Sequence, residues 1–486
     1  MTCALLLLGF ASVWQVRLGT QYALDYDEGV FLCSTRAALS GQPLFAAVFS
    51  SQPPAFLTLL KLACKLFGDS VLVGREVSVF FALMSLSAVG WIAWRLAGPL
   101  AAPSAMLALG LASLFFKEAR IVQAEMPALA WSLLALGALF ARPGRRAALM
   151  LMGAGACLAL GVLTKLLVAP MLCPALLLVV VGPEFNARRR FRSDPHALTL
   201  PYRFFVFGAA CAVVCLLGIL PWDRVALYDQ AIRFHTEMRR AFPLNLSANL
   251  RQVWLLLQLG AGTTLLAVTG LIGLARKKVL AAGWLVLWLS TVGLFLVMHA
   301  PLYQHHLALL LPPLAVAASA NVLWLTALRS KAAQAVLLGA LCLLSTVAYL
   351  PADTGEQGRL DWLPHLAAQS LAEEAQAEAP EQEVLQLIEQ YTRPGEFVVS
   401  DQQMQVFRAG RQPPPQLCDT SLARISSGYL TDEQAIRASA DSRMIIFWTD
   451  RLARLPAYRQ WVQTHFRLLK KFAAPPAALK EIYLKD

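Results

Sequence analysis

Asp25-Tyr26-Asp27-Glu28-Gly29 is the stretch from which the rest of this chain is best understood. It follows the first apolar segment, Cys3 to about Trp14, and places three carboxylates within four residues. Carboxylates at the edge of a hydrocarbon-like run must stay hydrated or find partners, because a buried unpaired charge is costly. We therefore predict that this cluster forms the floor of a reaction site and that later segments bring partners to it.

The composition indicates a polytopic membrane protein with a smaller soluble part. Of the 486 residues, 57% are hydrophobic and 15% are charged, against about 25% charged in soluble proteins. The net charge of +12 comes from Arg and Lys residues that collect in short loops between apolar runs. This is the positive-inside pattern of membrane proteins, so we expect no nucleic-acid partner. The nine cysteines show neither a disulfide framework nor a CxxC metal pattern.

Eleven apolar runs approach the roughly 20 residues that a membrane span requires. They lie at residues 2–16, 71–94, 100–116, 125–141, 146–164, 166–182, 203–221, 253–274, 280–298, 306–326 and 333–350. A further run, 55–67, is short and carries Lys61 and Lys65, so we predict that it does not cross on its own. With the basic loops in the cytoplasm, the amino terminus lies inside and the carboxy terminus outside.

Two segments outside the spans are expected to wall the site. Residues 29–50 form an amphipathic helical stretch, interrupted at Gly41-Gln42-Pro43, of the kind that lies in the membrane interface; a surface connector is the alternative. The loop from Trp222 to Arg251 is rich in charged residues and should line the same groove. Within it, Arg239-Arg240 could contact either substrate or anionic headgroups.

The carboxy-terminal part has a different composition. Residues 352–391 are rich in Ala, Glu and Gln with helical spacing, whereas 397–399 and 444–448 have the apolar character of buried strands. The sequence thus predicts a transmembrane domain over residues 1–350 and a small extracytoplasmic α/β domain over residues 351–486.

An ordered set of motifs makes the functional prediction more specific. In chain order these are Asp25-x-Asp27-Glu28-Gly29, Gly41-Gln42-Pro43-Leu44-Phe45, Gln52-Pro53-Pro54, Leu66-Phe67-Gly68, Arg75, Glu125-Met126-Pro127, Leu163-Thr164-Lys165, and His305-His306 leading to Leu311-Pro312-Pro313. Together they resemble the GT-C membrane glycosyltransferases, the superfamily of protein O-mannosyltransferases and lipid A aminoarabinose transferases. The chain is most similar to bacterial members that modify lipopolysaccharide cores.

This resemblance implies a sugar donor on a polyprenyl phosphate, used with inversion at the outer face of the cytoplasmic membrane. Such a transfer needs a carboxylate to take the acceptor proton and polar groups to hold the departing phosphate. By its place in the motif, Asp27 resembles the family's catalytic aspartate and is assigned as general base. Glu125 resembles a second acidic residue that orients the acceptor or holds a metal. Glu28 and Asp25 are further substrate-binding candidates, with Glu28 either a direct ligand or a partner that supports the site residues. A solvated loop that stops a helix is the alternative interpretation of their cluster.

Cationic and polar candidates for the donor phosphate come from later segments. Lys165 lies in a tight outer turn, where an ammonium group is costly unless it meets an anion such as a lipid phosphate. The alternative is a lysine that extends to the headgroups. Tyr303, His305 and His306 lie at the outer mouth of a span and are phosphate or metal candidates, although paired histidines more often only begin a helix.

One departure from the family pattern bears on metal binding. Gln52 stands in a Gln-Pro-Pro motif where many members have His-Pro-Pro or Glu-Lys-Pro, which removes a charge. Whether the protein requires a divalent metal ion, with Asp27 and Glu125 as candidate ligands, is therefore left open by the sequence. No other cofactor is expected.

The leading hypothesis is a multi-pass glycosyltransferase of the inner membrane. Its partners would be a polyprenyl-phosphate sugar, membrane lipids, and a glycan, lipid or protein acceptor. The alternative is a transporter or flippase of lipid-linked or amphipathic substrates. Transporters usually place ionisable residues near the membrane midplane and contain internal repeats, whereas this sequence places its acids at helix ends and has no apparent repeat.

Overall fold

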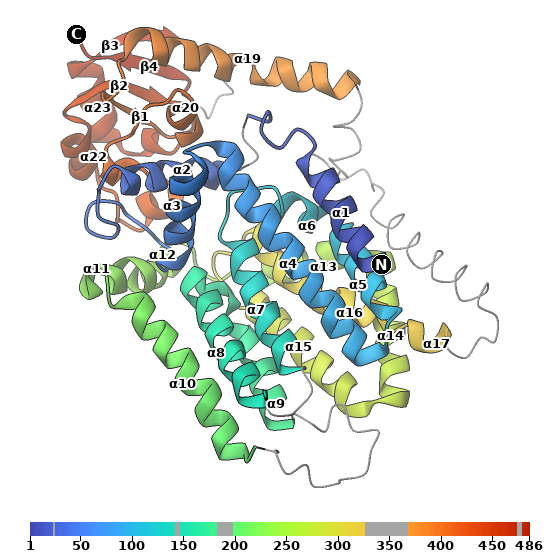
Figure 1. The fold of residues 1–486 in the computed structure, drawn as a ribbon. Helices are drawn as coiled ribbons and strands as arrows, with labels where there is room; N and C mark the ends of the chain where they lie inside the picture. Colours follow the sequence, from blue (N-terminus) through green and yellow to red (C-terminus); the bar gives the residue numbers. More distant parts are fainter. Residues whose placement is uncertain (23–24, 141–145, 182–197, 326–367, 474–478) are drawn as a thin grey trace.

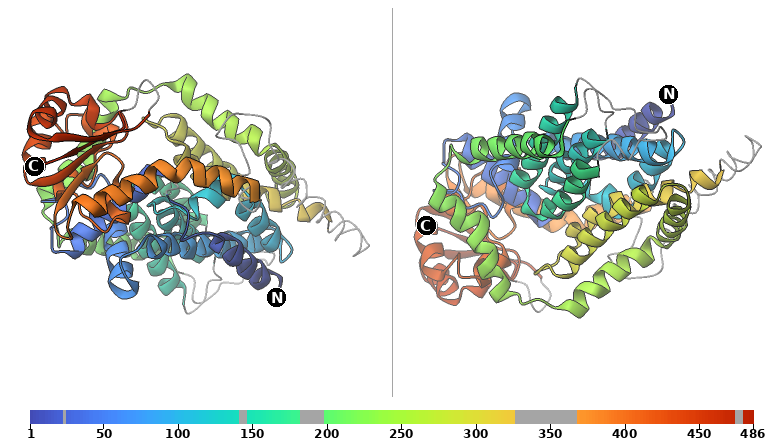
Figure 2. Two further views of the ribbon diagram at one scale, coloured as in Figure 1. Left: turned by 90° about the horizontal axis from the view of Figure 1, so that it is seen from above. Right: turned by 90° about the horizontal axis from the view of Figure 1, so that it is seen from below.

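The computed structural model describes residues 1–22, 25–140, 146–181, 198–325, 368–473 and 479–486. Figure 1 shows a bundle of helices with a small α/β domain docked at one end. In the view from above in Figure 2, the long helix α19 (Ala368–Tyr391) leads from across the bundle into this C-terminal domain.

Five helical segments within these ranges are long and apolar enough to cross a membrane. They are α4 (Val71–Ala97), α8 (Ala147–Thr164), α10 (Leu200–Ile219), α15 (Val279–Val297), and the run of η4 (Gln304–Leu310), α16 (Leu311–Ser319) and α17 (Val322–Leu325). Their buried faces share one large apolar core that includes Trp284 and Trp288. The chain is a polytopic helical membrane protein, as the sequence predicts.

Shorter or bent helices coincide with the other predicted spans. The short ones are α1 (Thr2–Gln15), α5 (Ala101–Gly110), α7 (Glu125–Leu139), and η1 (Leu166–Met171) followed by α9 (Leu172–Val181). Helices α13 (Leu246–Leu259) and α14 (Ala261–Lys277) meet at an angle of 88°, as in a broken span or a re-entrant loop. The predicted span at 333–350 and the domain boundary at residue 350 lie outside the described residues. The count of eleven crossings stays a prediction.

Helix α2 (Tyr26–Leu39) begins inside the acidic cluster. The Asp25 side chain caps the helix by accepting a hydrogen bond from the Asp27 backbone N–H (3.0 Å). The alternative interpretation of the cluster is a solvated loop that stops a helix; the structure places it instead at the start of the next helix, where the helix dipole favours negative charge. The helix ends before Gly41, whose φ of +94° allows the predicted interruption.

Helix α3 (Ala55–Phe67) has the two-sided character of an interfacial helix. Its 13 residues extend about 20 Å, less than the roughly 30 Å hydrocarbon core. One face is buried, and the other exposes Leu62, Leu66 and Phe67 beside Lys61 and Lys65. This geometry agrees with the prediction that the segment does not cross the membrane.

The C-terminal domain is built on a four-stranded sheet with the order β1-β2-β4-β3. Its strands are β1 (Phe397–Ser400), β2 (Ser442–Phe447), β3 (Arg467–Lys471) and β4 (Glu481–Leu484). The β1–β2 pair is parallel and the other pairs are antiparallel. The sequence predicts β1 and β2, which carry continuous apolar runs, but not β3, whose residues are partly or fully exposed.

Short helices complete this domain and the loops beneath it. In the C-terminal domain these are α20 (Gln403–Arg408), η7 (Pro415–Leu417), α21 (Leu422–Ser426), α22 (Asp432–Ser439), η8 (Leu452–Arg454) and α23 (Pro456–His465). Between the membrane helices they are α6 (Ser113–Glu118), α11 (Arg224–Tyr228), the π-helical turn η3 (Asp229–Arg233) and α12 (Phe234–Ala241).

The C-terminal domain packs directly on helix α2. At Gly29 a Cβ atom would lie 2.4 Å from the backbone nitrogen of Met404, so only glycine permits this approach of α2 to α20. The Arg36 guanidinium donates hydrogen bonds to the carbonyls of Phe407 (2.9 Å) and Arg411 (3.0 Å). The helix that carries Asp27 is therefore held against the C-terminal domain at two points along its length.

Candidate active site

The three acids of the first cluster face different surroundings. Glu28 is fully buried and accepts two hydrogen bonds of 2.8 Å from the Arg75 guanidinium, and one of its oxygens also accepts from the Val122 backbone N–H. Arg75 in turn donates to the carbonyls of Leu18 and Gln21. The structure thus places Glu28 behind the site, where it ties α2 to α4 and to the segment before α7.

Asp25 and Asp27 line a cavity of about 730 Å³ between the bundle, α12 and the C-terminal domain. Gln52, Lys165, Tyr303, His305 and His306 line it as well, so eight of the nine residues singled out from the sequence lie at or next to one cavity. Glu125 is the member that lies just behind the cavity wall, in contact with Lys165.

The Asp27 carboxylate is poised for proton exchange. It accepts no hydrogen bond from the described residues. It retains some exposed surface, but protein surrounds it on most sides, and this burial raises its pKa to about 8. Repulsion from Asp25 contributes to this raised pKa, whereas the Lys165 ammonium opposes the shift. A carboxyl group with a pKa near neutrality in a cavity is suited to general acid–base chemistry.

Glu125, Lys165 and His305 form a compact cluster at the first residue of α7 and the C-terminal end of α8. Lys165 donates a short hydrogen bond to a Glu125 carboxylate oxygen, and the His305 Nε2 atom lies 3.4 Å from the same oxygen. The Lys165 side chain is 10% exposed and that of Glu125 is 4% exposed. The Lys165 charge is thus already matched by Glu125 inside the protein.

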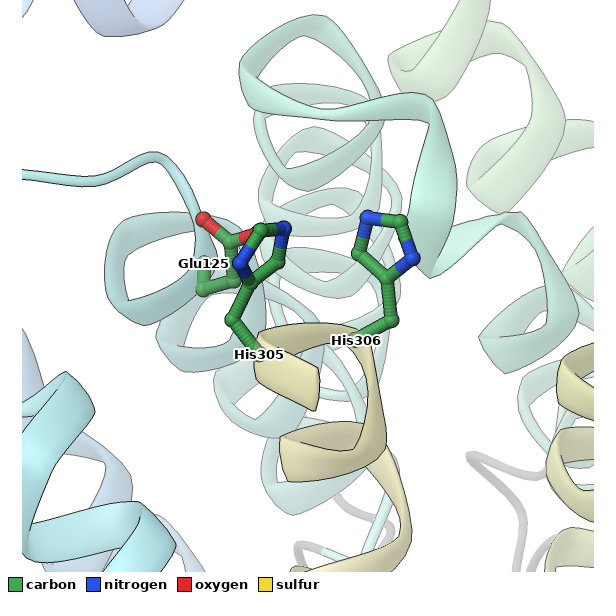
Figure 3. A group of neighbouring side chains, drawn as sticks. All are labelled: Glu125, His305 and His306. Carbon is green, nitrogen blue, oxygen red and sulfur yellow. The ribbon is translucent and has the colours of Figure 1, made fainter. Parts of the chain in front are cut away.

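The same region holds the described residues that best resemble a metal site. One ligand atom each of Glu125, His305 and His306 lies within 4.8 Å of the other two, and Figure 3 shows their side chains. Two of these ligands are engaged, however. Lys165 forms an ion pair with the Glu125 carboxylate. The His306 Nδ1 atom accepts a hydrogen bond from the Tyr303 backbone N–H (3.3 Å), so the ring proton of a neutral His306 lies on Nε2. This arrangement fits a divalent ion poorly, and Asp27 does not belong to it.

The structure adds three charged residues that the sequence did not single out as site residues, and it brings Arg239, from the loop predicted to line the groove, to the same cavity. Lys117 and Arg239 line the cavity from α6 and α12, and Asp419 and Arg451 line it from the C-terminal domain. Lys117 lies one residue beyond the span predicted at 100–116, but the helix α5 ends at Gly110 and a separate short helix, α6, presents Lys117 to the cavity. Asp419 and Arg451 follow no recognisable motif, because their position depends on how the C-terminal domain docks.

An apolar side of the cavity lies next to these charges. It is formed by Leu57, Leu166, Phe234, Met238 and Phe295, which come from α3, η1, α12 and α15. The cavity therefore offers carboxylates and cations together with a hydrocarbon-lined wall, as a substrate with a polar head and an apolar tail requires.

Solved structures show which fold this is. ArnT from Cupriavidus metallidurans superposes with a TM-score of 0.64 at 14% identity, over 99% of this chain and 97% of that one, both in the apo state and bound to undecaprenyl phosphate. The chain has the same fold as ArnT, the GT-C fold.

Two further comparisons found similar proteins. The archaeal oligosaccharyltransferase AglB from Archaeoglobus fulgidus, in complex with an inhibitory peptide and a dolichol-phosphate, has a TM-score of 0.51 at 10% identity, over 100% of this chain and 74% of that one. The family described as dolichyl-phosphate-mannose-protein mannosyltransferase matches residues 51–222, which include Glu125 and Lys165 but not Asp27. Among curated proteins, no sequence matches this chain.

Proposed function

We propose that this protein is a glycosyltransferase that moves a sugar from a polyprenyl-phosphate donor to an acceptor hydroxyl at the outer face of the cytoplasmic membrane. One observation carries the proposal. Asp27 and the Glu125–Lys165 pair, far apart in sequence, meet at a single cavity that also has an apolar wall. The undecaprenyl phosphate bound to ArnT and the dolichol-phosphate bound to AglB support this choice of donor.

In the proposed reaction, the acceptor oxygen attacks the anomeric carbon while the bond to the phosphate oxygen breaks. Asp27 takes the proton of the acceptor hydroxyl, and the phosphate leaves with the bonding electrons. A single displacement of this kind inverts the anomeric carbon. Glu125, fixed by Lys165 and His305, would orient the acceptor or keep the Asp27 surroundings polar. No step needs a metal ion, in keeping with the occupied ligands of the Glu125 cluster.

The donor phosphate requires cations that are not already neutralised. Lys117 and Arg239 expose their charged groups to the cavity and form no ion pair with the described residues. We assign the phosphate to these two residues, with the Lys165–Glu125 pair at its edge. Charge-assisted hydrogen bonds to the phosphate would then stabilise the departing group.

The assignment is tested by binding of undecaprenyl phosphate to the purified full-length protein. We expect Arg239→Met and Lys117→Met each to weaken binding about tenfold or more, as loss of a charge-assisted hydrogen bond requires. Arg240→Met is the matched control, because Arg240 is exposed and pairs with Glu237 (2.7 Å). Equal affinities of all three variants and the parent would refute the phosphate assignment.

The transporter hypothesis has less support in this geometry. The charged residues of the cavity lie at helix ends and in loops beneath a docked α/β domain. Ionisable residues of transporters lie instead near the membrane midplane, between moving repeats.

A further inference from the structure

The C-terminal domain contributes its own wall to the cavity. Two of its loops reach the site, one through Asp419 after η7 and the other through Arg451 after β2. Neither residue belongs to the acid and cation set described above for proton transfer and the donor phosphate. Their place opposite the membrane helices raises the question of what they bind.

Each loop is held in place by a buried charged residue. Asp401, fully buried, accepts hydrogen bonds from the backbone N–H groups of Trp448 (2.7 Å), Thr449 (2.9 Å) and Leu452 (3.2 Å). These bonds fix the turn that presents Arg451. A buried carboxylate that accepts three backbone hydrogen bonds makes this turn rigid before any substrate arrives.

The Asp419 loop is fixed in the same way by a cation. Arg424 is 7% exposed and donates hydrogen bonds of 2.6 Å to the carbonyls of Gln416 and Asp419. One Asp419 carboxylate oxygen accepts from the Ser421 backbone N–H (2.7 Å). Both presenting loops are therefore preorganised.

The charged groups of Arg451 and Asp419 form no ion pair with the residues that the structure describes. The Arg451 guanidinium stacks on the Tyr26 ring, with its central carbon 3.7 Å from the ring centroid, and donates no hydrogen bond to the described residues. The second carboxylate oxygen of Asp419 accepts none from them. The protein thus exposes an array of N–H donors and a carboxylate acceptor on one side of the cavity.

Tyr303 and Asp27 lie next to this array. Burial, with Asp27 and Asp419, raises the pKa of Tyr303 to about 12, and Arg451 opposes this rise, so all three charged residues act on the Tyr303 ring. Asp419 also contributes to the raised pKa of Asp27. The array therefore borders the base, whereas Lys117 and Arg239 belong to α6 and α12 of the membrane part.

We propose that Asp419 and Arg451 form the acceptor subsite and that it recognises a sugar residue of a glycan. This inference rests on the proposed function. Neighbouring hydroxyls of a sugar need donors and acceptors side by side, which a guanidinium and a carboxylate supply, and the rings of Tyr26 and Tyr303 offer flat faces for its C–H surface. Bound there, the sugar presents a hydroxyl to Asp27.

A peptide acceptor fits this wall less well. Extended peptides are usually held by main-chain hydrogen bonds to an exposed strand edge. None of the described strand residues of the C-terminal sheet lines the cavity. The wall consists of loop and helix residues whose polar groups are side chains.

The proposal is tested with full-length variants expressed in cells from which the gene has been deleted. Arg451→Gln and Asp419→Asn are compared with two controls from the same domain, Arg454→Gln and Asp441→Asn. Arg454 lies three residues from Arg451 but pairs with Asp450 on the surface, and Asp441 is exposed. Mass spectrometry measures sugar transferred to envelope glycans, and purified protein reports undecaprenyl phosphate binding and melting temperature.

We expect the two subsite variants to transfer at least tenfold less sugar while undecaprenyl phosphate binding changes less than twofold and the melting temperature is retained. Arg451→Lys keeps the positive charge but lacks the planar guanidinium with its paired N–H donors, so it should transfer more sugar than Arg451→Gln but less than the parent. Normal transfer, a parallel loss of undecaprenyl phosphate binding, or sugar found on peptide would overturn the proposal. A parent protein that neither transfers sugar nor binds undecaprenyl phosphate would instead refute the proposed function itself.

Discussion

At the residue scale, the chemistry depends on how Asp27 holds its proton. Its carboxyl group lies in the first turn of α2, where the helix dipole favours the anion, yet burial raises its pKa to about 8. The Asp25 charge raises the pKa of Asp27, and the Lys165 charge lowers it. A base with a pKa near neutrality is a compromise between being deprotonated and binding a proton strongly.

The pH dependence of transfer follows from these charges. A base with a pKa of about 8 is mostly protonated at lower pH, so kcat/KM should rise about tenfold per pH unit up to about pH 8 and then level off. Asp25→Asn removes a repelling charge but keeps a good helix cap, so the rise should shift to lower pH. An unshifted profile in Asp25→Asn would mean that another group controls the rate.

At the element scale, α2 connects the two parts of the molecule. The Glu28–Arg75 pair joins it to α4, and the close approach at Gly29 joins it to α20. Neither contact touches the cavity, but both determine where Asp27 lies. We infer that the position of the base depends on buried contacts along the whole helix.

Removing one half of the buried pair tests this dependence. Arg75→Met leaves the Glu28 carboxylate buried without its cation, which typically costs about 3–5 kcal/mol. The melting temperature in detergent should therefore fall strongly. Glu28→Gln/Arg75→Met removes both charges and should be more stable than Arg75→Met alone, whereas a double variant as unstable as the single one would contradict the account.

The sequence anticipated much of this arrangement, for identifiable reasons. Long apolar runs predict the membrane spans. The order of short motifs identifies Asp27, Glu125 and Lys165 together as candidate site residues. For Glu28 the sequence left open a direct ligand or a supporting partner, and its contact with Arg75, 47 residues away in the chain, favours the supporting role. Asp419 and Arg451 were not predictable, since docking of a separate domain places them at the cavity.

At the scale of the whole molecule, the account requires the cavity and the C-terminal domain to lie outside the cytoplasm. The domain packs on α2 beside the cavity, so both must share one compartment. A reporter that is active only outside the cytoplasm should be active when fused at the carboxy terminus. A reporter that is active only in the cytoplasm should be active when fused at Arg95, the basic end of α4. A cytoplasmic carboxy terminus would contradict the predicted orientation.

The most direct test of the central claim is sugar transfer by Asp27→Asn in a membrane assay with a polyprenyl-phosphate donor. The amide keeps the size of the side chain but cannot take the acceptor proton. We predict folded protein with unchanged undecaprenyl phosphate binding and a rate reduced about 100-fold to 10,000-fold, the usual contribution of a general base. Transfer at the parent rate would show that Asp27 is not the catalytic base.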